Sequence, residues 1–276
     1  MSGIMYIIGT PIGNLEDITL RQLRILKEVD FICAEDTRVT AKLLNYYEIK
    51  NQLVSFHEHS TKAEAVRIIE RLQNGENCGV VTDAGMPCIS DPGEVLVKMA
   101  CENGVEVKAV PSATAVTTAV ALSGMSVKRF VFEGFLPVSR KERTERLELA
   151  RSEKAVTVFY EAPHKLRNTL ADFLEYFGGD RKIALCREIT KIHEEVLRFT
   201  VSEAVSYYQE HEPRGEYVLV LEENISDNGG ISIEQAFEQV KKLIEAGEKP
   251  VDACKAVAKE TGYRKGELYS MLCSEK

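Results

Sequence analysis

Apolar residues in the first part of the chain alternate between two spacings. Short apolar runs typical of strands are separated by segments such as 62–74, where apolar residues recur every three or four positions as in helices. A second helical segment, 92–103, begins with proline at a plausible first-turn position. Strands alternating with helices predict a parallel sheet covered by helices, with ligands bound at the carboxyl ends of its strands. The strand-like runs are 4–8, 31–34, 53–56, 78–82 and 105–110.

The pattern changes after residue 113. Residues 114–124 (TAVTTAVALSG) predict a helix of small residues that leads into a second half. The apolar runs 182–189 and 194–200 are too close in sequence for a helical crossover between them, so we expect them to pair antiparallel. A mixed sheet is therefore predicted. Its other strands are expected at 130–135, 155–160 and 216–223, with helices at 139–152 and 163–177.

The last part of the chain has a helical pattern without strands. Residues 224–230 (NISDNGG) have the composition of a linker, and 231–276 read as helices interrupted by a Thr-Gly-Tyr turn, a candidate helix-turn-helix. The predicted fold is α/β, with a mainly parallel N-terminal sheet and a mixed C-terminal sheet. The predicted organisation is an N-terminal α/β domain over 1–113, a mixed α/β domain over 114–223, the linker and the helical extension.

Composition places the protein among globular proteins. Its 276 residues suggest two domains at roughly 150 residues each, and 44% of the residues are hydrophobic while 28% are charged. No stretch reaches the roughly 20 apolar residues of a membrane span, and the first residues do not resemble a signal peptide. We therefore expect no membrane association.

Cysteine spacing and net charge narrow the classes further. The seven cysteines are scattered and form no CxxC pair, which favours reduced, mostly buried thiols in the cytoplasm over a disulfide framework or a metal site. The net charge of −8 argues against nucleic-acid binding through the overall field. Any RNA partner has to be held by local contacts.

The first glycine loop does not match the common phosphate-binding motifs. A dinucleotide-binding loop needs a third glycine between Gly9 and Gly13, where this chain has Pro11. A P-loop needs lysine after its last glycine, and Asn14 follows Gly13. The loop is either a plain turn between strand and helix or the wall of a site for a ligand without phosphate.

A second loop, 80–93 (VVTDAGMPCISDPG), follows a β-branched strand. Its glycines and prolines force the backbone through a stiff path, which suits a preformed site. Ser90 or Asp91 capping a helix that begins at Pro92 explains the end of the motif. Capping does not explain DAGMP, which precedes it.

Seven motifs together resemble one family. The sequence is similar, from about residue 5 to residue 223, to the ribosomal RNA small subunit methyltransferase I family of the tetrapyrrole methylase superfamily. The resemblance implies S-adenosylmethionine as cofactor and methylation of the ribose 2′-oxygen of a cytidine in 16S ribosomal RNA near the decoding centre. It also implies a cofactor cleft between two α/β domains and a homodimer. The motifs, in order, are GTPIGNLEDIT, EDTR, DAGMPCISDPG, FEGFLP, YEAPHK, REITK and HE.

The resemblance also assigns the cofactor contacts. S-adenosylmethionine carries a sulfonium cation, an amino acid and an adenosine but no phosphate, so a glycine loop without lysine or arginine suits it. A carboxylate such as that of Asp83 favours the cationic part. The residues implied to contact the cofactor are Pro11, Asp83, Ala84, Gly85, Ile89, Ser90, Thr114 and Ala115.

Three positions depart from the family pattern. Ser112 stands where glycine is usual in the PSATA junction, and serine adopts positive φ less readily. Met86 replaces a frequent threonine in the second loop. Lys165 replaces arginine after the Pro-His pair, which keeps the charge but loses the bidentate fork.

Transfer of a methyl group to a hydroxyl is an in-line displacement that depends on positioning. A base that accepts the hydroxyl proton adds ~10²–10⁴-fold. The candidates are Glu161, His164 and Glu188, which stand near predicted strand ends. Each has a structural alternative, since the first two can serve a helix start and Glu188 can pair with Arg187 or Lys191.

Basic residues near these motifs are candidates for RNA phosphate or ribose contacts. Charge alone does not establish this role, because segments 138–154 and 241–276 each carry only +2 and a solvated helix face explains them equally well. The candidates are Lys165, Arg187, Lys191, Lys255, Lys259, Arg264 and Lys265.

Two other functions remain open at this point. The first is methylation of carbon in a tetrapyrrole, which the YEAPHK and REITK motifs and the C-terminal extension disfavour. The second is a regulator without catalytic activity, whose helix-turn-helix reads DNA while the α/β part senses a nucleotide. The weakly basic recognition segment disfavours that function.

Overall fold

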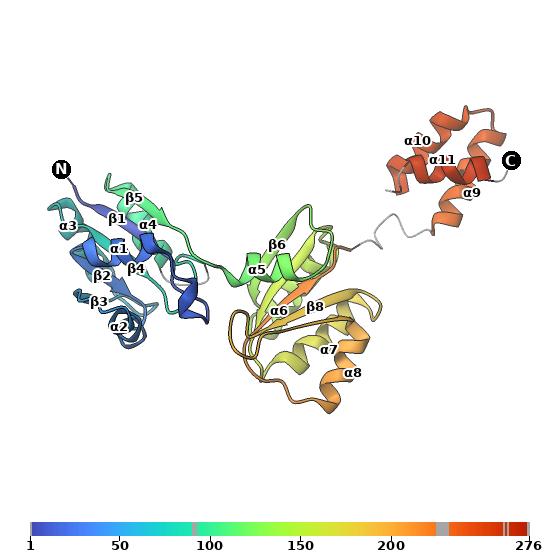
Figure 1. Ribbon diagram of the computed structural model, residues 1–276. Coiled ribbons are helices and arrows are strands. Elements are labelled where there is room, and N and C mark those ends of the chain that lie inside the picture. The colour runs from blue at the N-terminus through green and yellow to red at the C-terminus, as the bar shows by residue number, and fades with distance from the viewer. Residues whose placement is uncertain (1, 90–92, 225–231, 262, 264, 275–276) are drawn as a thin grey trace.

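The computed structural model describes residues 2–89, 93–224, 232–261, 263 and 265–274. Figure 1 shows two sheets that follow one another along the chain, each with its own helices, and a separate group of three C-terminal helices. None of the helices in the described ranges is long and apolar enough to cross a membrane.

The first sheet is parallel throughout, as predicted from the alternating pattern. Its strand order is β3-β2-β4-β1-β5, so the central strand β4 lies between β2 and β1. All residues of β2 and β4 are buried, as expected for strands covered on both faces. The bounds are β1 (Ile4–Ile8), β2 (Phe31–Ala34), β3 (Leu53–Ser55), β4 (Cys78–Val81) and β5 (Glu106–Val110).

Helices cover both faces of this sheet. Ile68 of α3 and Leu96 of α4 contribute to the core on one face, whereas Ile25 of α1 and Leu44 of α2 contribute to the core on the other. The loops that follow the strands lie at the carboxyl ends of the sheet, which the helices on its two faces do not cover. The helices are η1 (Leu15–Asp17), α1 (Leu20–Glu28), α2 (Thr37–Tyr46), α3 (Lys62–Gln73) and α4 (Gly93–Glu102).

The second sheet is mixed, as predicted. Its order is β6-β7-β10-β8-β9; β6 and β7 are parallel, and the other neighbours are antiparallel. The expected antiparallel pairing of the two close runs is confirmed by β8 and β9. The bounds are β6 (Phe130–Phe135), β7 (Val156–Glu161), β8 (Lys182–Arg187), β9 (Glu195–Thr200) and β10 (Tyr217–Leu221).

Two different helix layers cover the second sheet. Val116 and Ala119 of α5 pack on one face, and Leu147, Leu166 and Ala204 of the other helices pack on the opposite face. Successive side chains of each strand therefore pack alternately against α5 and against the helices on the opposite face. The helices are α5 (Ala115–Leu122), α6 (Arg140–Ser152), α7 (Leu166–Phe177) and α8 (Val201–Glu210).

Two expectations about this half need correction. The helix expected over 163–177 begins at Leu166, because the amides of Lys165 and Leu166 bond to carbonyls three residues back and form a tight turn. The strand expected to run to residue 189 ends at Arg187, because Glu188 has a φ of 50° and leaves the extended conformation. Both differences shape the loops of the candidate site.

Helix α8 was not among the predicted elements, although a local signal for it exists. Thr200 accepts a hydrogen bond from the amide of Glu203, and the Glu203 carboxylate accepts one from the amide of Thr200. This capping box, a threonine followed by glutamate three residues later, is readable in sequence.

The three C-terminal helices pack around their own small core, which contains Phe237, Val240 and Leu268. The predicted helical extension is thus present, but its helix-turn-helix role and the proposed domain boundaries stay predictions. Linker residues 225–230 lie outside the described part of the chain. The helices are α9 (Ile233–Glu245), α10 (Pro250–Thr261) and α11 (Lys265–Ser274).

The capping box of α8 allows a stability test. Thr200→Ala removes the oxygen that caps the helix and should lower the free energy of unfolding by about 1 kcal/mol. Thr200→Ser keeps a capping oxygen and serves as the control. Urea denaturation with unchanged m-values measures the difference. Equal stability of the two variants would contradict the capping role.

Candidate functional site

Backbone hydrogen bonds join the two conspicuous loops. The amide of Thr10 donates to the carbonyl of Gly85 at 2.9 Å, and the amide of Gly85 donates to the carbonyl of Thr10 at 3.1 Å. The Thr10 hydroxyl donates to the carbonyl of Thr82 at 3.1 Å. The Ser112 hydroxyl donates to the Thr10 carbonyl at 3.2 Å. Loops far apart in sequence, and the junction after β5, therefore meet at Thr10.

Close packing explains Gly9, and backbone conformation explains Gly85. A Cβ atom on Gly9 would overlap the side chain of Ser112 and lie 2.7 Å from the Met86 sulfur. Gly85 has a φ of 85°, which favours glycine. Ser112 is not among the described residues with positive φ, so the serine departs from the family pattern without backbone strain.

Three carboxylates gather where β2 and β4 end. The Thr82 hydroxyl donates to Glu35 at 2.6 Å, and the amide of Asp36 donates to Asp83 at 3.1 Å. Hydrogen bonds from Arg38 lower the pKa of Asp36 to about 2. Partial desolvation raises the pKa of the Asp83 carboxyl, although the side chain is exposed, and the neighbouring acids raise it further.

The EDTR motif is part of the family resemblance, but the sequence analysis predicts no role for Glu35 and Asp36. The signal was available, because EDTR directly follows β2, and the carboxyl ends of β2 and β4 lie at the same edge of a parallel sheet.

The structure brings most of the predicted cofactor residues together. Pro11 and Gly85 are buried at the bridged loops, and Asp83 and Ala84 are exposed beside them. Thr114 caps α5, and Ala115 begins that helix. Ile89 is exposed further along the second loop. Ser90 lies outside the described residues.

The candidates in the second half share one edge of its sheet. Glu161 at the end of β7 and Arg187 at the end of β8 both lie opposite Tyr217, so the two strands end at the same level. The loops that follow them carry the remaining candidates of this half. The residues at this edge are Glu161, His164, Lys165, Arg187, Glu188 and Lys191.

The first glycine loop contacts this edge. A Cβ atom on Gly13 would lie 2.5 Å from Cγ of Lys191 and 3.1 Å from the hydroxyl oxygen of Thr190. Ile12 packs against the apolar cluster that contains Ile189. The first glycine loop, which carries the predicted cofactor contact Pro11, therefore adjoins the REITK loop of the second half.

An ion pair fixes the REITK loop. Lys191 Nζ lies 2.8 Å from a carboxylate oxygen of Glu188 and 2.8 Å from one of Glu216. Partial burial of Glu188 opposes its ionisation, but the bond from Lys191 and the Glu216 amide outweigh it and lower the pKa of Glu188. Partial burial likewise opposes ionisation of Lys191, and its two carboxylate partners raise its pKa. Both groups are charged at neutral pH.

Glu161 points to the face of the sheet opposite α5. Its carboxylate is buried, accepting from the amide of Ala162 at 2.8 Å and from the hydroxyl of Thr169. Arg143 in turn donates to the Thr169 hydroxyl at 2.8 Å. Both carboxylate oxygens are therefore engaged in contacts with the loop after β7 and with α7.

The neighbouring basic candidates differ in their surroundings. Arg187 Nε lies 3.3 Å from a carboxylate oxygen of Glu195 on the adjacent strand. Lys165 occupies the N-cap of α7 and is partly exposed, and His164 is exposed in the turn before it. His164 and Lys165 are thus the more accessible candidates of the YEAPHK motif.

The remaining RNA-contact candidates belong to the C-terminal helices and lie far from these loops in sequence. Lys255 in α10 and Lys265 at the start of α11 are exposed. Lys259 lies in α10, but its side chain and Arg264 are outside the described part.

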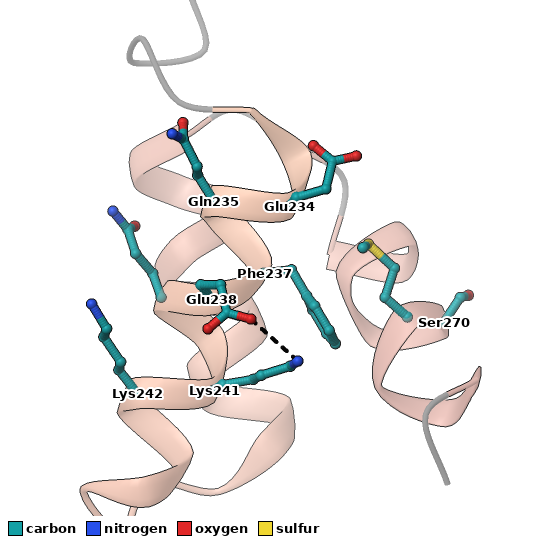
Figure 2. Close-up of a pocket in the computed structure, with 9 residues that line it drawn as sticks. Glu234, Gln235, Phe237, Glu238, Lys241, Lys242 and Ser270 are labelled. Atoms are coloured by element: carbon teal, nitrogen blue, oxygen red, sulfur yellow. Dashed lines mark ion pairs between the residues drawn. The ribbon is translucent and has the colours of Figure 1, made fainter.

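A groove of about 790 Å³ lies between α9 and α11, as Figure 2 shows. None of its lining residues is a predicted contact residue. The groove is lined by Glu234, Gln235, Phe237, Glu238, Gln239, Lys241, Lys242, Ser270 and Met271.

Within the described residues there is no group of three or more histidine, cysteine, aspartate or glutamate side chains placed to hold a metal ion. Four of the six cysteines with described side chains, Cys33, Cys78, Cys186 and Cys254, are buried, in agreement with the expectation of mostly buried thiols.

The contact at Gly9 gives a second testable prediction. Gly9→Ala should destabilise the fold by about 1–3 kcal/mol, because the added methyl group overlaps Ser112 in a tightly packed junction. Ser112→Gly removes the overlapping atoms, so the double variant should recover part of the loss. Urea unfolding of both single variants and the double variant measures this coupling. Strictly additive effects would refute the contact.

The ion pair at Glu188 gives a prediction that depends on pH. Because the pKa of Glu188 in the folded protein is lowered from 4.5, its ionised form stabilises the fold above that value. Glu188→Gln should cost about 1 kcal/mol at pH 7. The difference from wild type should shrink as the pH falls through the lowered pKa of the folded state. Denaturation curves at neutral and acidic pH measure it; a constant difference would contradict the ion pair.

Comparison with known proteins agrees with this architecture. The profile of the family described as Tetrapyrrole (Corrin/Porphyrin) Methylases matches residues 5–205. "Ribosomal RNA small subunit methyltransferase I" of Thermotoga maritima is 49% identical over 219 residues, which cover 79% of this chain and 98% of that protein. The protein of the same name from Halalkalibacterium halodurans is 42% identical, covering 99% of this chain and 96% of that protein.

Solved structures share the fold at low identity. Diphthine synthase superposes with a TM-score of 0.63 at 14% identity, covering 80% of this chain and 90% of that one. Uroporphyrin-III C-methyltransferase from Thermus thermophilus, complexed with S-adenyl homocysteine, gives a TM-score of 0.56 at 17% identity, covering 80% and 97%. Together with the profile match and the close relatives, these findings show that the chain belongs to the tetrapyrrole methylase family.

Proposed function

We propose that this protein is an S-adenosylmethionine-dependent methyltransferase that methylates the ribose 2′-oxygen of a cytidine in the 16S RNA of the small ribosomal subunit. The observation that carries the proposal is the contact of the first glycine loop with the REITK loop, at Gly13 and Lys191. This contact supports the proposal, because it joins the loop that carries a predicted cofactor residue, Pro11, to the loop that carries predicted RNA contacts. Those relatives are 38–49% identical and carry the name given above.

The chemistry of the loops supports this cofactor. Residues 9–13 and 82–87 contain hydroxyls, backbone groups and the Asp83 carboxylate, but no lysine or arginine. Glu35 lies in the same group of carboxylates as Asp83, whereas Arg38 balances the charge of Asp36. Such a set suits a cationic ligand without phosphate. When bound, the cofactor supplies an electrophilic methyl group with a good leaving group.

The protein's own residues then position the hydroxyl and accept its proton. Glu161 is buried with both oxygens engaged, and Glu188 is held as a carboxylate by Lys191, which makes it a weaker base. His164 is exposed at the same edge, and imidazole is the most frequent general base in enzymes. We therefore propose His164 as the proton acceptor among the three candidates.

Lys165, Arg187 and Lys191 remain the proposed RNA contacts of the second sheet. The carboxylates of Glu188 and Glu216 neutralise the charge of Lys191. In this arrangement the main role of Lys191 is therefore to hold the REITK loop in place. The candidates of the C-terminal helices are proposed as auxiliary contacts, because the family profile ends at residue 205, before α9. About a fifth of this chain also lies outside the match to the Thermotoga maritima relative.

The names of the close relatives favour RNA over a tetrapyrrole as substrate, and favour an enzyme over a regulator without catalytic activity. Modification near the decoding centre, a homodimer and a cytoplasmic location remain parts of the proposal.

The function can be tested directly. The protein is incubated with methyl-labelled S-adenosylmethionine and either naked 16S RNA or small subunits that lack the modification. We expect label in the RNA, mapping to one cytidine and blocked by a 2′-deoxy substitution there. His164→Ala should lower the rate by ~10²–10⁴-fold while cofactor binding, measured by calorimetry, is retained.

Absence of label from both substrates, with normal cofactor binding, would overturn the proposed substrate. Label in the base instead of the ribose would overturn the proposed oxygen acceptor. An unchanged rate in His164→Ala would exclude that residue as the proton acceptor.

Lys255→Ala changes a proposed auxiliary RNA contact in the C-terminal helices. It should weaken RNA binding and leave cofactor binding unchanged.

A further inference from the structure

Phe135 is an exposed aromatic side chain at the carboxyl end of β6. Its exposed fraction is 56%, although it belongs to a strand. Its ring centroid lies 5.4 Å from that of Tyr160, and Tyr160 meets Phe132 edge-on at 4.9 Å. The Phe135 ring is thus supported by Tyr160, which in turn packs against Phe132, while much of the Phe135 surface stays open to solvent.

A bulge in β6 creates this arrangement. Phe132 and Phe135 are three residues apart, so on a regular strand they would point to opposite faces. The register with β7 shifts between Phe132 and Gly134, and Gly134 has a positive φ of 67°. The extra residue brings both phenylalanines to the face of Tyr160. Bulges commonly re-aim side chains next to active sites.

Tyr160 connects this aromatic group to the candidate cofactor site. Tyr160 packs against the apolar cluster that contains Val116, in the first turn of α5. The residues just before it, Thr114 and Ala115, are predicted cofactor contacts. Tyr160 and Ile12 of the first glycine loop also pack against the same apolar cluster. Phe135 therefore lies at the open margin of the proposed reaction site.

We propose that Phe135, held in place by Tyr160, is the stacking platform for the base of the nucleotide whose ribose is methylated. This inference rests on the proposed function. Sequence-specific RNA recognition stacks unpaired bases on aromatic side chains, and such stacking does not depend on net charge. A chain with a net charge of −8 has particular need of contacts of this kind.

Kinetics of three variants test the platform. Phe135→Ala should reduce kcat/KM for the RNA substrate by about 5- to 150-fold, the range expected for loss of one base–aromatic stack. Phe135→Tyr keeps the ring and should retain near wild-type activity. Phe130→Ala is the matched control, because Phe130 is an exposed aromatic at the other end of the same strand, with an exposed fraction of 39%. It should leave kcat/KM unchanged.

Fluorescence gives a readout that does not depend on turnover. The sequence contains no tryptophan, so Phe135→Trp introduces a single reporter. Titration with naked 16S RNA should quench its emission, because a stacked base lies against the indole. Phe130→Trp should show little quenching under the same conditions. Equal responses of the two variants would overturn the platform.

The outcomes separate this inference from the proposed function. If the wild type methylates no RNA, the proposed function fails. If the wild type methylates RNA and Phe135→Ala behaves as Phe130→Ala does, only the platform fails. If Phe135→Ala instead changes the elution volume in size-exclusion chromatography, the ring serves contact between subunits, and the platform is likewise overturned.

Discussion

The pair of backbone hydrogen bonds between Thr10 and Gly85 is the contact on which the site depends. Because both partners are backbone groups, the bridge requires only that the two loops approach closely. The small size of Gly9 and the positive φ of Gly85 permit that approach. The Ser112 hydroxyl adds the chain junction to the same point. Two loops that lie far apart in sequence thus meet at one candidate site.

The charge distribution around this bridge limits what the candidate site can bind. Carboxylates from the ends of two parallel strands lie together near Asp83, and desolvation opposes the ionisation of Asp83 by raising its pKa. A ligand with phosphate groups would add like charge to this region, whereas a cation relieves the repulsion. On the other side, Lys191 contributes no uncompensated positive charge, because Glu188 and Glu216 neutralise it.

Much of the fold could be predicted from apolar spacing, because both sheets bury their faces and the strands alternate with amphipathic helices. The parallel first sheet and the antiparallel β8–β9 pair followed from spacing and connection length. Helix α8 was not predicted, because its capping box was the only local sequence signal for it that we identified. The late start of α7 and the left-handed Glu188 depend on hydrogen bonds within loops, which periodicity does not encode.

The candidate site was less predictable, because a one-residue step along a strand decides which face a side chain occupies. Glu161 and Tyr160 are neighbours in the YEAPHK motif, yet the first is buried against α7 and the second contacts α5. The sequence analysis predicts Glu161 as a candidate proton acceptor, because an ionised carboxylate can act as a general base, and it assigns no role to Tyr160. The sheet instead places the phenol, and through the β6 bulge Phe135, on the face covered by α5, whose first residue Ala115 is a predicted cofactor contact. Strand alternation therefore separates Glu161, which holds α7 to the second sheet, from Tyr160 and Phe135 on the opposite face.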